Sequence, residues 1–227
     1  MRGTEAPGFI RGERHTGKIM TEMLDIYDEN MSHLGSKARD EVHRDGDWHK
    51  VFHCWVIYRD DAGQDFLILQ KRAPDKDTFP NYLDISAAGH YAAGETIHEA
   101  MRELEEELGL FPEFDDLISL GLRVGVVKYK NLIDRQFADV YLYICNQALE
   151  DYNYQKEEIT GLIALNVKEG LRLFTGEIDS LDVPAAGYKN DRVTITKTDF
   201  IPVHDHYMEK IFLLTTRCLN GDSHLYI

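Results

Sequence analysis

The sequence predicts an α/β fold in which one layered domain combines a mixed sheet with a few helices. β-rich apolar runs alternate along the chain with segments of helical periodicity, which favours layers of both kinds. The length of 227 residues suits one substantial domain better than two. Hydrophobic residues make up 43% of the chain, enough for a sizeable core, and no internal repeat is visible.

Composition divides the chain into three parts. Residues 1–20 are rich in Gly and Arg without periodicity, which predicts a disordered N-terminal tail. Residues 21–50 are expected to form an N-terminal hairpin with its turn at 28–30, followed by a charged loop over 39–50. Residues 51–227 are expected to form the main domain.

Strands are predicted where β-branched and aromatic residues lie between turn signals. Residues 60–64 have the composition of a hairpin turn that joins the first two strands of the main domain. Two later strands are expected to pair with each other. The predicted strands cover residues 51–58, 66–69, 82–86, 120–128, 137–144, 162–165 and 193–195.

Three helices are predicted from apolar periodicity and capping residues. The first runs from about 96 to 108 and ends at Gly109, which favours a left-handed stop. The second follows Asn166, a residue that favours an N-cap. The third runs from about 206 to 219, with Asp205 as the expected N-cap.

The charge balance excludes several partners. The chain has 25 Lys and Arg against 40 Asp and Glu, a net charge of −15, so phosphate backbones are repelled and we expect no nucleic acid partner. No apolar run approaches the ~18 residues of a membrane span, and the N-terminus lacks the apolar centre of a signal peptide. We therefore expect a cytoplasmic protein with no membrane partner. The three cysteines form no CxxC pair and are expected to be reduced thiols.

One predicted helix carries a dense set of carboxylates. Glu103, Glu106 and Glu107 are spaced i, i+3, i+4 and share one helix face, where like charges are unfavourable. They also lie toward the helix C-terminus, where the macrodipole disfavours negative charge. A Mg²⁺ or Mn²⁺ ion would stabilise this arrangement. The alternative is a solvated face on which Arg102 pairs with Glu106, but the glycine-bracketed loop 89–94 favours the metal.

This segment, residues 89–110, resembles the Nudix box, G-x5-E-x7-R-E-U-x-E-E-x-G-U, in which U is aliphatic. Gly89 and Glu95 match its first half, and its second half matches Arg102, Glu103, Leu104, Glu106, Glu107, Gly109 and Leu110. The sequence departs from the pattern once, because six residues rather than seven separate Glu95 from Arg102. The departure puts in doubt the junction between loop and helix and the Glu95–Arg102 pair, both of which are structural in the box.

The resemblance implies a Nudix-type α/β/α sandwich with a mixed sheet, and Mg²⁺-dependent cleavage of a diphosphate linkage in a small, nucleoside-linked substrate. Mn²⁺ is the alternative metal. By the same resemblance, Glu103, Glu106 and Glu107 would bind the metal together with the Gly89 carbonyl. The general base would be Glu106 or Glu107 on the helix, or Glu157 or Glu158 on a distant loop. The alternative for Glu157 and Glu158 is an ordinary exposed pair before a strand.

The stretch 82–90 resembles the Nudix branch that includes isopentenyl-diphosphate isomerase. Ala88 stands where that isomerase has its catalytic cysteine, and a methyl group cannot donate a proton, so hydrolysis is favoured over isomerisation. A third hypothesis is a non-catalytic nucleotide-sensing domain. Its only support in the sequence is the residue missing from the box.

The sequence indicates the substrate-binding residues less specifically than the metal ligands. Lys71 and Arg72 follow a core strand and could neutralise substrate phosphates, or could be solubility charges at a strand end. His53 and His90 flank core strands and are expected to be structural histidines. The C-terminal helix could pack within the chain or across a homodimer.

Overall fold

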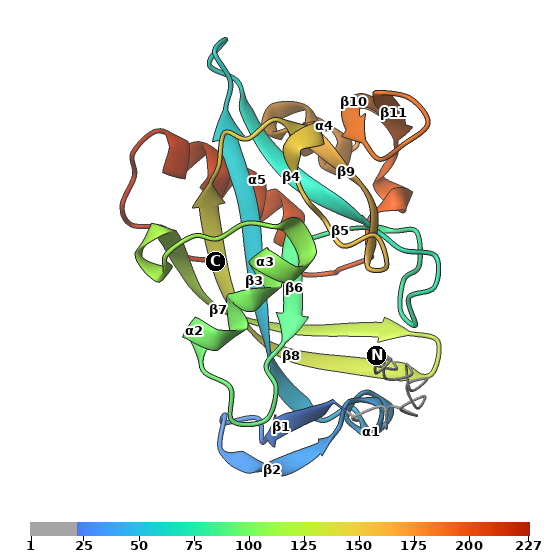
Figure 1. Cartoon of the computed structure of the whole chain (residues 1–227), viewed down its shortest axis with the longest axis vertical. Helices are drawn as coiled ribbons and strands as arrows, with labels where there is room; N and C mark the ends of the chain where they lie inside the picture. The colour runs from blue at the N-terminus through green and yellow to red at the C-terminus, as the bar shows by residue number, and fades with distance from the viewer. Residues whose placement is uncertain (1–21) are drawn as a thin grey trace, which may run out of the picture.

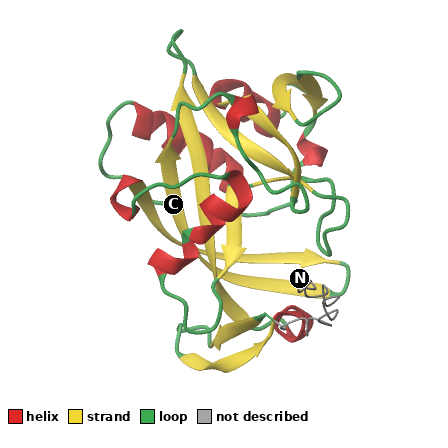
Figure 2. Cartoon of the chain, in the orientation of Figure 1, coloured by secondary structure: helices red, strands yellow, loops and turns green. Residues whose placement is uncertain are grey.

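The computed structural model describes residues 22–227 and shows one mixed sheet between two layers of helices (Figure 1). Helices α2 (Ile97–Ala100) and α3 (Arg102–Leu108) cover one face, and α4 (Val167–Thr175) and α5 (Tyr207–Leu219) cover the other (Figure 2). The predicted α/β/α sandwich is therefore confirmed. The predicted tail over 1–20 lies outside the described residues.

The sheet is organised around β3 (Trp48–Arg59), which pairs with strands on both of its sides. The strand order is β11-β10-β9-β4-β3-β1-β2. Outside this path, β8 pairs with β3 in parallel and with β7 on its other side. The short strands β5 and β6 pair with β4 and β3, respectively. The other strands are β1 (Met23–Tyr27), β2 (His33–Ala38), β4 (Asp65–Arg72), β5 (Leu83–Asp84), β6 (Ala87–His90), β7 (Leu117–Tyr129), β8 (Leu132–Ile144), β9 (Ile159–Asn166), β10 (Leu181–Ala186) and β11 (Arg192–Ile195).

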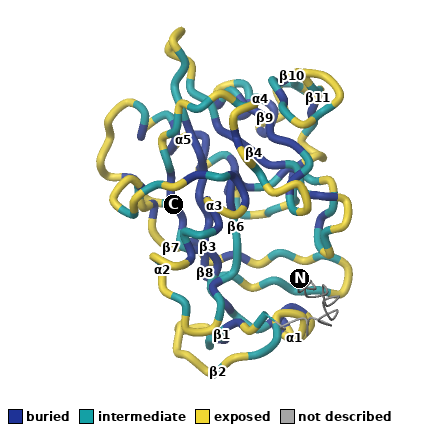
Figure 3. The backbone as a smooth tube through the Cα atoms, viewed as in Figure 1, coloured by how far each residue is buried: buried dark blue, intermediate teal, exposed yellow. Residues whose placement is uncertain are grey.

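Alternate residues of β3 enter two separate cores, because successive side chains of a strand point to opposite faces of the sheet. Trp55 and Ile57 pack in the cluster that includes the apolar side chains of α4 and α5. Cys54 and Val56 pack in the cluster that includes those of α3. Figure 3 shows the resulting buried centre, with exposed tips at the hairpins.

Strands β3 and β4 diverge along their length, and this divergence makes room for a cavity. They pair with each other only from 57 to 59, whereas residues 51–54 of β3 pair with β6 instead. Ser86 connects the two separated strands: its hydroxyl donates to the Ile68 carbonyl at 2.5 Å and accepts from the Val56 N–H at 2.8 Å. The segment β5–β6 therefore lies in the sheet, and its last residues, Gly89 and His90, lie beside the cavity.

The predicted N-terminal hairpin is confirmed as β1 and β2, and β1 continues the main sheet by pairing with β3. The predicted loop over 39–50 is wrong, since the segment forms helix α1 (Arg39–Asp45) and the start of β3. The helix is only seven residues long and buries Val42 as its one apolar side chain, so its sequence shows no helical periodicity. Gly46 ends it in the left-handed conformation, with φ of 71°.

The other helix predictions have mixed outcomes. Gly109 ends α3 with φ of 67°, and the Asn166 side chain accepts hydrogen bonds at the start of α4, as predicted. The prediction that Asp205 caps α5 is wrong. The N-cap residue is His206, which has a φ of 57° and makes no capping hydrogen bond with its side chain. Asp205 instead pairs with Arg123. Strand β10 was not predicted, because Pro and Gly interrupt its neighbourhood.

The predicted pairing of strands 120–128 and 137–144 is confirmed as β7 and β8, but the predicted bounds are too short. Both strands extend through residues 129–136, and they pair from Leu117↔Tyr143 to Tyr129↔Leu132. Among the described residues, the three cysteines are free thiols, as expected. None of the described helices is both long and apolar enough to cross a bilayer.

Candidate metal and substrate site

The carboxylate helix begins from a tight loop that follows β6. Gly94 takes a left-handed φ of 79° and donates its N–H to the Asp25 carboxylate at 2.8 Å, while Thr96 and Glu99 form a capping box at the start of α2. The helix then breaks at Met101, and the Leu104 N–H bonds back to the Met101 carbonyl at 2.9 Å, only three residues away. This turn lies within the segment where the box is one residue shorter than the family pattern.

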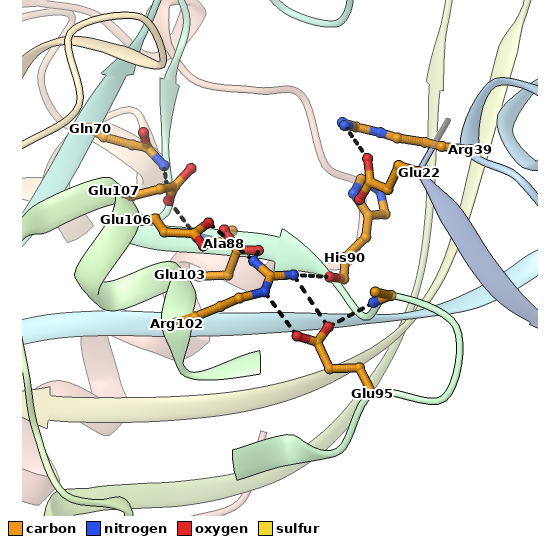
Figure 4. Close-up of polar contacts among 11 residues, drawn as sticks. Glu22, Arg39, Gln70, Ala88, His90, Glu95, Arg102, Glu103, Glu106 and Glu107 are labelled. Atoms are coloured by element: carbon orange, nitrogen blue, oxygen red, sulfur yellow. Dashed lines mark hydrogen bonds and ion pairs between the residues drawn. The ribbon is translucent and has the colours of Figure 1, made fainter. Parts of the chain in front are cut away.

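Arg102 connects the loop to the helix (Figure 4). Its Nε donates to Glu95 Oε1 at 2.9 Å, and its Nη2 lies 3.3 Å from both Glu95 Oε2 and the His90 carbonyl. Its Nη1 contacts the carboxylates of Glu103 and Glu106. The Glu95–Arg102 pair that the shortened box put in doubt is therefore present.

Two of the three carboxylates are buried, and the third is half-exposed. Glu107 Oε2 accepts the Ala88 N–H at 2.9 Å and the Gln70 Nε2–H at 3.0 Å, which fixes its orientation (Figure 4). Burial, reinforced by the charge of Glu103, raises the pKa of Glu107 to about 8. Burial also raises the pKa of Glu103, against the opposing effect of Arg102.

Gly89 lets the Glu103 carboxylate approach the backbone. A Cβ atom at this position would lie 2.5 Å from Glu103 Oε2 and would overlap the rest of the carboxylate. The φ of Gly89 is not positive, so glycine is needed for space rather than for backbone conformation. Carboxylates and a backbone carbonyl are hard oxygen donors, and burial disfavours the charged forms of Glu103 and Glu107 unless a cation lies beside them. The residues present therefore fit a Mg²⁺ or Mn²⁺ ion.

A cavity of about 430 Å³ opens beside these carboxylates. Charged side chains from α3 and the surrounding loops line part of it, among them Glu103, Glu107 and Arg72. Buried apolar side chains of the sheet and α5, such as Leu69 and Met208, line another part. A ligand can therefore place its anionic end at the carboxylates and an organic group in the interior.

The two basic residues predicted to bind substrate have different positions. Arg72 lines the cavity, but its guanidinium donates to Asp84 at 3.0 Å and to Thr78. The Lys71 ammonium lies 5.1 Å from the centre of the Tyr188 ring, and Lys71 does not line this cavity. Adjacent strand residues point to opposite faces, so only one of the two can face the site.

Lys76 is a basic group of the cavity that the sequence analysis missed. Its ammonium forms an ion pair with Glu158, the predicted distant base, and both residues line the cavity. Burial lowers the pKa of Lys76, and the nearby positive charge of Arg72 lowers it further. The loop Lys76 occupies has turn composition, which gives no signal for a site.

A second group of metal-type ligands lies in the same region. The ring nitrogens of His43, His49 and His90 lie within 4.8 Å of one another, and His49 is fully buried. His49 Nε2 is 3.3 Å from Asp134 Oδ1, and neither atom has a hydrogen-bond partner among residues 22–227. Burial lowers the pKa of His43 and of His90, which keeps these imidazoles neutral. Neutral imidazoles suit Zn²⁺, Co²⁺ or Fe²⁺ better than Mg²⁺.

His53 and His90 were both expected to be structural histidines, but they differ. His53 Nδ1 lies 3.1 Å from the Tyr207 hydroxyl in the interior, and burial lowers the pKa of His53 to about 3, as expected of a structural histidine. His90 belongs to the histidine group. His43 and His49 were missed because they lie in the segment interpreted as a loop, 41 residues or more before His90 in the chain.

Fold and site together define an α/β/α protein with an oxygen-rich cation site next to a ligand-sized cavity. A family model described as the NUDIX domain matches residues 47–172. An uncharacterised Nudix hydrolase of Clostridium acetobutylicum is 39% identical over 199 residues, which cover 85% of this chain and 95% of that protein. The chain belongs to the NUDIX domain family.

Two further comparisons agree with the sequence analysis. An isopentenyl-diphosphate Delta-isomerase of Serratia proteamaculans is 32% identical over 124 residues, 54% of this chain and 66% of that protein, which matches the noted resemblance to this branch. The crystal structure of a Deinococcus radiodurans protein superposes with a TM-score of 0.52 at 25% identity, covering 68% of this chain and 90% of that one.

Proposed function

We propose that this protein is a Mg²⁺-dependent hydrolase that cleaves the diphosphate linkage of a small, nucleoside-linked compound. The observation that carries the proposal is the pair of buried carboxylates that line the cavity, Glu103 against Gly89 and Glu107 against the Ala88 N–H. Two buried acids so close to each other are unfavourable without a cation, and the donor set suits Mg²⁺ or Mn²⁺.

The side chains of the site have distinct roles in this reaction. Glu103, Glu106 and Glu107 would hold the cation together with the Gly89 carbonyl. Arg102 orients Glu103 and Glu106, and the N–H groups of Ala88 and Gln70 orient Glu107. A bound Mg²⁺ or Mn²⁺ would polarise phosphoryl oxygens and lower the pKa of water.

Glu158 is the candidate general base that lies apart from the helix. It lines the cavity and is held by Lys76 rather than by the carboxylate helix, so it is free of the metal-ligand set. Arg72 and Lys76 supply positive charge beside the substrate phosphates. Glu106 and Glu107 are the alternatives for the base, and Glu107 has one oxygen already engaged by two donors.

The two alternatives from the sequence are less well supported. An isomerase of this branch needs an acid at position 88, and the side chain of Ala88 cannot donate a proton. A non-catalytic sensing domain was suggested only by the missing box residue, and the turn at Met101 keeps the Glu95–Arg102 pair and the carboxylate face together in spite of it.

The test is product release from nucleotide sugars, dinucleotides, nucleoside triphosphates and isoprenyl diphosphates, with and without Mg²⁺ or Mn²⁺. We expect metal-dependent cleavage that Glu103→Gln and Glu107→Gln each reduce at least a hundredfold. Glu105→Gln is the matched control, since Glu105 is exposed on the same helix. Unchanged activity in both buried variants would refute the proposal, and conversion to an allylic product without phosphate release would support the isomerase.

A further inference from the structure

A second polar group faces the same cavity, in the part lined by β7 and α5. Arg123 on β7 is only 7% exposed and lines the cavity beside Tyr207 and Trp55. No hydrogen bond or ion pair within residues 22–227 connects Arg123 to the carboxylates of α3. The arginine therefore belongs to a part of the site that the proposed hydrolysis does not use.

The guanidinium of Arg123 is held in a fixed plane. Its Nε donates to Asp205 Oδ2 at 2.7 Å, and its Cζ lies 4.1 Å from the centre of the Tyr207 ring. Gly125, two residues further along β7, leaves space for it: a Cβ there would lie 2.6 Å from Nη1 and 2.9 Å from Cζ. The Tyr207 hydroxyl in turn accepts from Trp55 Nε1 at 2.9 Å, so the ring cannot move easily.

The donors of this guanidinium are mostly unused. Of its five N–H groups, the one on Nε is engaged, and Nη1 and Nη2 have no acceptor among the described residues. Asp205 Oδ1, next to the pair, is also buried and without a partner in residues 22–227. Leaving the buried Asp205 oxygen unsatisfied is unfavourable, and an apolar residue would pack here at lower cost. A ligand that supplies the missing hydrogen-bond partners would account for this arrangement.

The charge balance decides which kind of ligand group fits. Asp205 pairs with Arg123, so an added anion would leave this buried group with a net negative charge. A neutral carbonyl group can accept from Nη1 and Nη2 without adding charge. An alkyl tail would bury these N–H groups without an acceptor, and sites built to form hydrogen bonds reject such analogues strongly.

We propose that Arg123, held by Asp205, Tyr207 and the space above Gly125, is a specificity-determining residue that binds a carbonyl-bearing neutral group at the non-phosphate end of the substrate. This inference rests on the proposed function, because it assigns the other part of the same cavity. It adds a residue that selects the organic group.

The test compares two non-cleavable probes: methylenediphosphonate, and the α,β-methylene analogue of uridine diphosphate, which adds a nucleoside with base carbonyls. Affinities are measured by calorimetry with Mg²⁺ for the wild type and for Arg123→Met, which keeps the length but removes the donors. We expect the wild type to bind the uridine probe more tightly. The variant should lose about 10- to 100-fold of that preference, the range expected for hydrogen bonds to a charged group.

Arg217→Met is the matched control, since Arg217 lies on α5, is half-exposed and does not line the cavity; it should leave the preference unchanged. Two results would overturn the inference. One is an unchanged ratio of the two affinities in Arg123→Met, which includes equal loss of both probes. The other is a wild type that binds the uridine probe no more tightly than methylenediphosphonate. Binding is measured without turnover, so failure of the proposed hydrolysis is detected separately by the cleavage assay.

Discussion

Replacing Gly89 by Ala should separate the activity of this protein from its stability. The new Cβ would lie 2.5 Å from Glu103 Oε2, whereas ordinary contact begins near 3.4 Å, so the Glu103 carboxylate must move by about 1 Å or more. A displacement of about 1 Å in a catalytic group can reduce the rate about a hundredfold. We therefore expect kcat/KM with Mg²⁺ to fall by about two orders of magnitude in Gly89→Ala.

Stability should change little in the same variant. The atoms that the Cβ would meet belong to the end of a flexible side chain, which can turn away into the cavity. The backbone of Gly89 is compatible with alanine, and Gly→Ala at such a position reduces unfolded-state entropy by about 0.4–1 kcal/mol. The free energy of unfolding from urea titration should therefore stay within about 1 kcal/mol of the wild type.

A double-mutant cycle gives the sharpest test of this reasoning. If Gly89→Ala acts through Glu103, then the double variant with Glu103→Gln should be no less active than Glu103→Gln alone. Calorimetry with Mn²⁺ should show the same pattern for metal affinity. Additive losses, or a Gly89→Ala protein with activity within twofold of the wild type, would show that the Gly89–Glu103 contact does not position the metal ligand.

Three further predictions concern pH, metal content and packing. Burial raises the pKa of Glu107 from 4.5 to about 8, so the metal-free protein should lose stability as pH rises across this interval. Glu107→Gln should flatten that part of the plot of melting temperature against pH. A plot unchanged by the substitution would contradict the raised pKa of Glu107. The group of His43, His49 and His90 should bind one Co²⁺ ion, detected by visible absorption. His49→Gln should remove this absorption, and His206→Gln at an exposed site should retain it. Equal spectra in the two variants would show that the metal binds elsewhere. Tyr207→Phe, which removes the acceptor of the Trp55 N–H, should lower the free energy of unfolding by about 1–3 kcal/mol in urea titration, whereas Tyr226→Phe at an exposed site should not.

The sequence predicted the carboxylate helix well, because local rules determine it. The spacing of Glu103, Glu106 and Glu107 sets a shared face, and Gly109 sets the helix end, both within a few residues. The one uncertain feature was the missing residue before Arg102. In the structure the helix breaks at Met101, where the Leu104 N–H bonds to a carbonyl three residues back, and no spacing rule predicts where this break lies.

The parts of the site that the sequence did not predict depend on distant pairing. His90 reaches His49 because β6 pairs with β3, and the register places Val51 opposite His90. Asp134 joins them because β8 pairs with β3 in parallel. Arg123 meets Asp205 across 82 residues, so Asp205 serves as an ion-pair partner rather than the expected helix cap. Each residue looks ordinary in its own segment, and only the register of three strands brings them together.

The divergence of β3 and β4 explains how one cavity can combine these groups. A fully paired sheet would separate the two helical layers, and side chains from α3 could not share a cavity with those from α5. Where residues 51–54 of β3 pair with β6 instead of β4, the short β6 strand brings Gly89 and His90 to the sheet edge beside Glu103. The cavity therefore has carboxylates from α3 and the guanidinium of Arg123 in one space. A diphosphate at the carboxylates would then leave its organic group to be selected by residues of the opposite layer.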